Sequence, residues 1–152
     1  MKNLLLFAGL AAVLGGTVAS VHLAAQQSSY SPNDIKMLGT LDNGQTSKLI
    51  EYSNTPQYRA FVFEGSGHDQ VEVTVTGGNG KAFIALADST LSPIASGNGR
   101  LSATLPYHGP DIEAFYILVK SSANQPEQFA VHLKKTPGLK PTASAQPLDA
   151  TH

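Results

Sequence analysis

Ser66, His68 and Asp69 are the residues of this 152-residue chain whose types could carry out hydrolytic chemistry together. A serine hydrolase needs a nucleophile, a histidine base and an acidic group that orients the histidine. Neighbours on one loop seldom form such a triad, and no serine of the chain lies in a Gly-x-Ser-x-Gly elbow. We therefore interpret this stretch as a solvated turn and predict that the protein is not an enzyme.

Acidic residues in predicted loops are candidate calcium ligands. Ca²⁺ takes hard oxygen ligands, and loop carboxylates supply them at extracellular sites. We predict Asp111 and Glu113 as the metal candidates, with no other cofactor indicated. The remaining candidates Asp34, Asp42 and Asp88 are scattered, and turn formation alone accounts for Asp42 and Asp88. The five histidines are too far apart for a local zinc motif such as His-Glu-x-x-His.

Tyr107 and His108 are the candidate binding residues. Together with Tyr58 they are aromatic side chains near the ends of predicted strands. An exposed aromatic ring on a β-sandwich can stack on a sugar or contact a protein partner. The alternative is that these side chains belong to the core, because five Tyr and six Phe must supply most of its aromatic groups.

β-Strands must position these candidates, because the chain alternates apolar and polar residues with a period of two. In segment 70–76, Val71, Val73 and Val75 alternate with polar residues, which is typical of a strand with one buried face. No segment combines a helical period with capping residues. We predict about eight strands, over residues 36–41, 46–50, 58–64, 70–76, 81–88, 101–105, 114–120 and 128–134, with a further short one around Ile94.

Short strands separated by Gly/Pro turns predict an all-β fold, a single jelly-roll-like antiparallel β-sandwich. Asp42-Asn-Gly44 is a turn signal between the first two strands. An Asn-Gly turn within 77–80 predicts a β-hairpin between the strands that flank it. The predicted core consists of Phe61, Phe63, Val71, Val73, Val75, Ile84, Leu86, Ile117, Val119, Phe129, Val131 and Leu133.

The N-terminus predicts export. An apolar run over 4–18 follows the positive charge of Lys2, and small residues near 18–25 suit signal-peptidase cleavage. The alternative is a membrane anchor, but the run is shorter than the roughly 20 residues that a spanning helix needs. We predict a signal peptide over 1–25, a flexible lead-in over 26–35, the sandwich over 36–135 and a disordered tail over 136–152. The mature chain is then periplasmic or extracellular, with no membrane span.

Charge and composition argue against several partners. Removal of residues 1–25 leaves nine basic and eleven acidic residues, and the largest basic cluster is the Lys134-Lys135 pair. A nucleic-acid partner is therefore not expected. The chain contains no cysteine, so no disulfide supports the fold, but the mature length suffices to bury a core.

A series of short motifs along the chain resembles the bacterial pre-peptidase C-terminal domain. The motifs are Gly39-Thr-Leu, Tyr58-x-x-Phe-x-Phe, Gly65-x-Gly, Val71-x-Val-x-Val, Ala85-Leu-Ala-Asp, Leu105-Pro-x-x-Gly109, Tyr116-Ile-Leu-Val and Phe129-x-Val-x-Leu. The resemblance implies a small jelly-roll sandwich of the kind appended to secreted proteases, in a family whose members can bind calcium. Residues 110–114 are an insertion relative to that pattern, which makes Asp111 and Glu113 the best calcium pair, and no peptidase domain accompanies the motifs.

Three classes of function follow, in order of preference. The first is an exported, non-catalytic binding or interaction module for a polysaccharide or a protein. The second is a structural subunit of an extracellular assembly or filament, in which strands would join edge to edge. The third is a small secreted hydrolase, which would need a serine joined to His68 or His108.

Overall fold

The computed structural model describes residues 28–53, 55–122 and 126–139. The predicted signal peptide and residues 140–152 of the predicted tail lie outside this part of the chain. The described residues contain no helix with the length and hydrophobicity needed to cross a membrane. A 3₁₀ turn and nine strands make up the regular structure described: η1 Pro32–Asp34, β1 Ile35–Thr40, β2 Ile50–Tyr52, β3 Tyr58–Gly65, β4 Gln70–Gly77, β5 Phe83–Ala87, β6 Pro93–Asn98, β7 Arg100–Thr104, β8 Glu113–Lys120 and β9 Glu127–Thr136.

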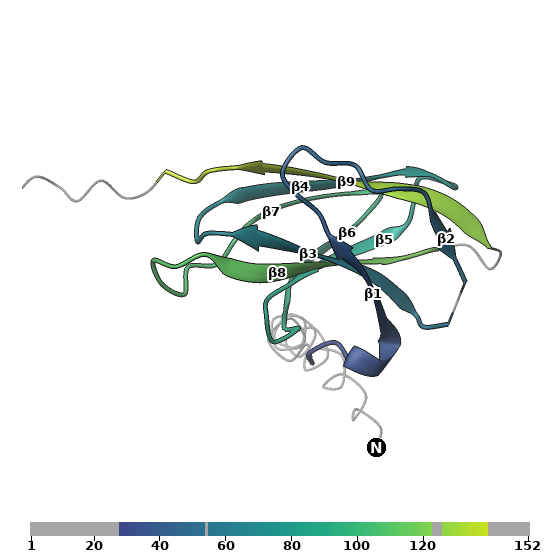
Figure 1. The fold of residues 1–152 in the computed structure, drawn as a ribbon, viewed down its shortest axis with the longest axis horizontal. Coiled ribbons are helices and arrows are strands. Elements are labelled where there is room, and N and C mark those ends of the chain that lie inside the picture. Colours follow the sequence, from purple (N-terminus) through teal and green to yellow (C-terminus); the bar gives the residue numbers. More distant parts are fainter. Residues whose placement is uncertain (1–27, 54, 123–125, 140–152) are drawn as a thin grey trace, which may run out of the picture.

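The strands form two packed layers, so the predicted all-β sandwich is confirmed (Figure 1). The nine strands form one continuous hydrogen-bonded sheet in the order β1-β3-β8-β5-β6-β7-β4-β9-β2. It folds over between β6 and β7, which share only the pair Asn98 and Arg100. Strands β1, β3, β8, β5 and β6 make one layer, and β7, β4, β9 and β2 make the other.

The core lies between the layers and contains every residue predicted for it. Val73 shows why the alternation predicted it: this residue of β4 is fully buried, and its cross-strand partners Leu101 and Leu133 are buried as well. Phe115 and Leu105, which were not predicted, belong to the same cluster. The apolar residues at alternate positions of each strand therefore face the core between the two layers.

The predicted hairpin at 77–80 is wrong. The local turn forms, with the Gly80 N–H donating to the Gly77 carbonyl. However, β4 pairs with β7 and β9, whereas β5 pairs with β6 and β8. Both edges of β4 are already occupied, and the nearly continuous apolar sequence of β5 suits the centre of the opposite layer. The turn therefore carries the chain from one layer to the other.

The two predicted strands that flank Asp42-Asn-Gly44 do not pair with each other either. β1 pairs with β3 in parallel, which departs from the antiparallel prediction. Residues 44–47 instead run along β9, where the Gly44 N–H donates to Leu133 and the Ser47 N–H to Val131. The second strand accordingly begins at Ile50 rather than Thr46. The chain leaves the layer after β1 and returns for β3 in the same direction, which makes the pair parallel.

Part of the predicted lead-in lies on the outer face of the β3-β8-β5 layer. Ala60, Ala85 and Leu118 on this face are fully buried. The Tyr30 ring contacts Tyr58 edge-on, at a centroid distance of 5.4 Å. The Tyr30 N–H also donates to the Leu91 carbonyl at 2.9 Å. The folded unit therefore starts before residue 36.

Candidate binding site at one end of the sandwich

Three segments, residues 65–69, 105–113 and 136–139, meet at one end of the sandwich, which we call the loop end. Backbone hydrogen bonds join the first two, since the His68 N–H donates to the Leu105 carbonyl and the Leu105 N–H donates to the Asp69 carbonyl, both at 2.9 Å. The third segment touches the first at Gly138, where any Cβ would lie 2.0 Å from the His68 carbonyl oxygen. The loop end is thus closely packed although it lies outside the strands.

Asp69 fixes these segments to one another. Its side chain is buried, with 7% of the residue exposed. One carboxylate oxygen accepts a hydrogen bond from the Ser66 N–H at 2.9 Å, and the other accepts one from the Gly138 N–H at 3.2 Å. Such bonds compensate a buried carboxylate for lost hydration. Asp69 therefore has a structural role.

Tyr107 stands at the surface of the loop end and is nevertheless held in place. Its ring stacks on His68, with centroids 5.2 Å apart and planes inclined by 9°. Gly67 permits this approach, because any Cβ there would lie 2.6 Å from the Tyr107 ring. Tyr107 remains 59% exposed. The predicted binding residue is therefore an exposed and positioned aromatic ring.

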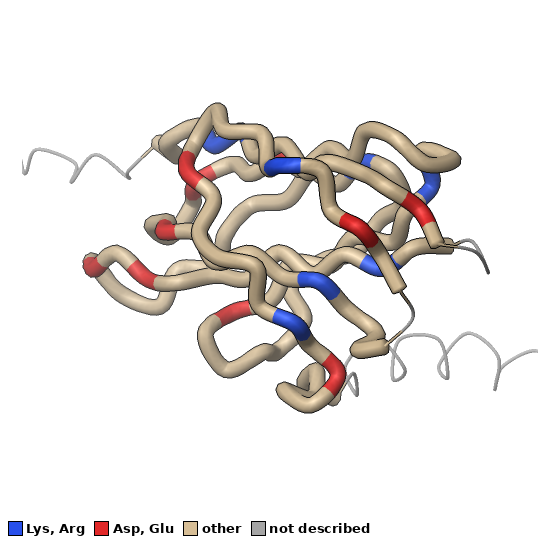
Figure 2. Tube along the Cα trace, turned by 45° about the vertical axis from the view of Figure 1, so that its right-hand side comes forward, with Lys and Arg blue, Asp and Glu red and all other residues tan. Residues whose placement is uncertain are grey.

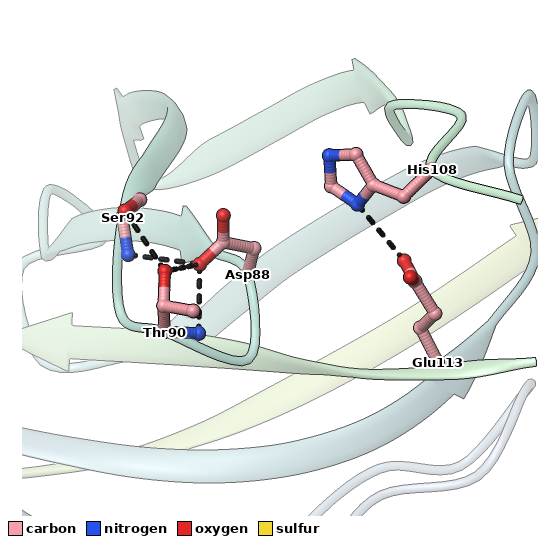
Figure 3. A network of polar contacts seen from close by, with 5 residues as sticks. All are labelled: Asp88, Thr90, Ser92, His108 and Glu113. Atoms are coloured by element: carbon pink, nitrogen blue, oxygen red, sulfur yellow. Dashed lines mark hydrogen bonds and ion pairs between the residues drawn. The ribbon is translucent and has the colours of Figure 1, made fainter.

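His108 and Glu113 pair across the adjoining loop. The imidazole Nδ1 and the Glu113 Oε2 atoms are 3.0 Å apart (Figure 3). Both side chains are partly exposed, so the pair contributes little stability but closes the loop that carries Asp111 and Ile112. The structure thus joins a predicted binding residue to a predicted metal ligand. It leaves Asp111 exposed.

The turn at Asp88 lies in the same region (Figure 3). Asp88 Oδ1 accepts hydrogen bonds from the Thr90 N–H, the Thr90 hydroxyl and the Ser92 N–H, at 2.8, 2.7 and 3.0 Å. Partial burial raises the pKa of Asp88, but the bonds from Thr90 and Ser92 and the charge of His108 together bring this pKa below its ordinary value. The carboxylate therefore serves the turn that sequence reasoning assigned to it.

The predicted metal candidates Asp111 and Glu113 lie in the loop that the His108–Glu113 pair closes. Among residues 28–53, 55–122 and 126–139, no group of three or more acidic, histidine or cysteine side chains could hold a metal ion. Glu113 is also engaged by His108. A calcium ion at Asp111 and Glu113 would have to take its other ligands from backbone carbonyls and water.

Ser66, His68 and Asp69 do not form a triad in the described structure. Asp69 accepts from backbone amides, and the His68 ring lies against Tyr107. The stretch instead supports the loop end, a role that sequence reasoning missed. The spacing of Ser66 and Asp69 was a usable signal for a side-chain-capped turn.

Two exposed apolar residues of the loop end were also missed. Ile112 is 68% exposed and Leu139 is 96% exposed. A lone apolar residue in a polar insertion was the available signal for Ile112. Leu139 lies in a segment that proline content marked as tail, and the contacts of Gly138 with His68 and Asp69 bring it to the site.

Comparisons with known proteins define the fold only. No protein-family model matches the chain, and no curated protein matches it. Among solved structures, the periplasmic g-type lysozyme inhibitor PliG of Aeromonas hydrophila matches with a TM-score of 0.50 and 10% identity, over 67% of this chain and 97% of that one. At this identity the match supports a shared sandwich fold.

Two further solved structures have lower scores. The pre-peptidase C-terminal domain of the Bacillus anthracis collagenase has a TM-score of 0.45 and 11% identity, over 69% of this chain and 99% of its own. PliG of Salmonella Typhimurium, also a periplasmic inhibitor of g-type lysozyme, has a TM-score of 0.44 and 18% identity, over 66% and 98%. A pre-peptidase C-terminal domain is thus among the similar structures, as the sequence motifs predicted.

Proposed function

We propose that this protein is an exported, non-catalytic module that binds a protein partner through the loop end. The carrying observation is Tyr107, an aromatic side chain that is 59% exposed yet stacked on His68. A side chain already fixed in one position loses little conformational entropy on binding. Tyrosine is also enriched among the residues that dominate the energy of protein interfaces.

The surroundings of Tyr107 favour a protein over a sugar. Ile112 and Leu139 are exposed apolar side chains on the other segments of the loop end. Sugars are recognised by aromatic stacking together with polar groups, whereas large exposed aliphatic side chains are better buried by a protein surface. The His108–Glu113 pair would then lie at the polar rim of such an interface.

The fold and the N-terminal sequence support the same proposal. PliG of Aeromonas hydrophila is a periplasmic inhibitor of g-type lysozyme, so a domain of this fold can act by binding a protein. The apolar run over 4–18 accounts for export to a compartment where such a partner would be met.

The test is a titration of the purified protein, by calorimetry, against g-type lysozyme and separately against soluble peptidoglycan fragments. We expect saturable binding to the protein ligand, weakened at least about tenfold by Tyr107→Ala, because an anchor residue is lost. Met37→Ala is the matched control, since Met37 is exposed on β1 and lies outside the loop end. Binding to the fragments alone would show that the ligand is a glycan. Equal affinities of the Tyr107→Ala and Met37→Ala variants would show that the loop end takes no part in binding.

A further inference from the structure

The sandwich is open along one side, between its two terminal strands. The ladder ends at β1 in one layer and at β2 in the other. Between these ends lies a groove of about 550 Å³, bounded by β1 on one wall and residues 45–51 on the other. We call this feature the edge groove. It lies near the start of β3, whereas the loop end begins at Gly65, the last residue of β3, so the two sites are separate.

The edge groove has an apolar floor, and side chains of β1 line one of its walls. Leu38 of β1 and Phe61 of β3 line it together with Ile50 of β2. Lys36 and Thr40 line it as well, two residues to either side of Leu38, while Met37 does not. The β1 register shifts between Met37 and Gly39, so Lys36 and Thr40 reach the groove from either side of a bulge at Leu38. An added strand would therefore meet side chains from both halves of β1.

The free edge of β1 offers the backbone groups that an added strand requires. In the described part of the chain β3 is the strand that pairs with β1, and β1 is exposed over 36–40. A terminal strand leaves one row of N–H and C=O groups without strand partners. Addition of an extended peptide to such an edge is an established way of binding a protein segment.

The charge of the edge groove selects the peptide. Lys36, Lys48 and Arg59 line it against the one acidic residue Glu51. The ion pairs found among the described residues are Arg100–Glu72 and His108–Glu113, so these three cations have no carboxylate partner there. Arg59 is 2% exposed, is held by the Ser53 and Pro56 carbonyls and lies over the Tyr52 ring at 5.2 Å, so Lys36 and Lys48 are the exposed cations of the groove. Two copies of the groove would repel each other, which argues against self-association.

We propose that the edge groove binds an extended segment of a partner protein in which apolar residues alternate with acidic ones, paired with β1 as an additional strand. The apolar side chains of the segment would cover Leu38 and Leu49, the exposed apolar side chains of the groove, while its carboxylates would face Lys36 and Lys48. This proposal does not depend on the function proposed for the loop end.

The probe is a fluorescent, N-acetylated peptide that alternates valine with aspartate, titrated against the purified protein by anisotropy at low ionic strength. Peptides that alternate valine with lysine, or carry N-methyl groups on alternate amides, serve as comparisons. We expect the aspartate peptide to bind at least about tenfold tighter than either one, because it alone has both the charge and the backbone donors.

Variants locate the binding. Leu38→Glu should weaken binding of the aspartate peptide at least about tenfold, while Met37→Glu, on the same strand but outside the groove lining, should not. Reversal of both Lys36 and Lys48 to Glu should transfer the preference to the lysine peptide, and Tyr107→Ala should change nothing. Melting curves identify any variant that fails to fold, and the charge-reversal result then stands independently of Leu38.

Three outcomes would overturn the proposal. One is the absence of binding by the aspartate peptide, and another is binding that Leu38→Glu and the charge reversal leave unchanged. The third is a concentration-dependent dimer of the protein, seen by analytical ultracentrifugation and abolished by Leu38→Glu, which would assign the groove to a second copy.

Discussion

Asp69 shows how a single buried carboxylate can be built into a surface site. It accepts hydrogen bonds from the backbone N–H groups of Ser66, in its own segment, and of Gly138, which is 69 residues further along the chain. Backbone donors hold a carboxylate in a fixed position, since they cannot rotate away as a lysine or arginine side chain can. The stacked pair of Tyr107 and His68 is thereby carried on a rigid support.

Asp88 provides a pH-dependent prediction at the residue scale. Its pKa is lowered in the folded protein, so its charge stabilises the fold above the unfolded value of about 3.9, and this contribution is lost as the pH falls through the folded pKa. We expect Asp88→Asn to lower the urea midpoint at pH 7 (a small effect, because solvent screens the site). The difference in urea midpoint between Asp88→Asn and the unmodified protein should become smaller below about pH 4.

The control for this experiment is Asp111→Asn, because Asp111 is exposed on its loop. Asp111→Asn should have the same urea midpoint as the unmodified protein, both at pH 7 and in acid. A difference for Asp88→Asn that is equally large at pH 7 and in acid would show that the charge of Asp88 does not stabilise the turn.

Individual site residues were predicted better than the contacts among them. Aromatic type and position near a strand end identified Tyr107 and His108 from the sequence alone. The stacking of Tyr107 on His68 was not predictable, because it depends on how the two loops meet at the end of the sandwich. Glu113 was assigned to a metal for its oxygen atoms, yet a histidine five residues away uses one of them.

At the scale of elements, the crossing at 77–80 explains both a success and a failure of sequence reasoning. Alternation predicted β4 and its buried face, because that pattern depends on local burial. The Asn-Gly signal predicted a turn correctly but a hairpin wrongly. A turn type describes how the chain reverses locally, whereas the pairing of β4 with β7 and β9 is decided by strands distant in the sequence.

Two glycines of this crossing should respond differently to substitution. Gly77 and Gly80 both have positive φ, 97° and 68°. A Cβ at Gly77 would lie 2.8 Å from the Gln128 carbonyl oxygen, but one at Gly80 would meet nothing within 4 Å. We expect Gly80→Ala to cost about 1 kcal/mol of backbone strain and Gly77→Ala about 3 kcal/mol, because the β9 backbone must also move.

Urea unfolding followed by circular dichroism measures both variants, and each serves as the reference for the other. Equal midpoints would show that the close contact between the crossing and β9 does not constrain the fold. A larger loss for Gly80→Ala than for Gly77→Ala would contradict the placement of the crossing itself.

The described part of the molecule is one sheet folded into two layers, with the loop end and the edge groove as two separate candidate sites. Figure 2 shows positive and negative residues interspersed along the described chain, without an extended face of one sign in that view. We therefore do not expect long-range attraction to a strongly charged polymer to bring about binding. Specific recognition would instead depend on the exposed, positioned side chains of the loop end and on the exposed Lys36 and Lys48 of the edge groove.

Site-specific photo-crosslinking in the native cells would show directly whether the loop end binds a protein. A photoreactive phenylalanine derivative would replace Tyr107 in one strain and the exposed Lys134 of β9 in another. We expect a discrete protein adduct from position 107 and none from position 134, and the identified partner should bind the purified protein less tightly after Tyr107→Ala. The absence of any adduct at position 107, or the same adducts at both positions, would contradict this expectation.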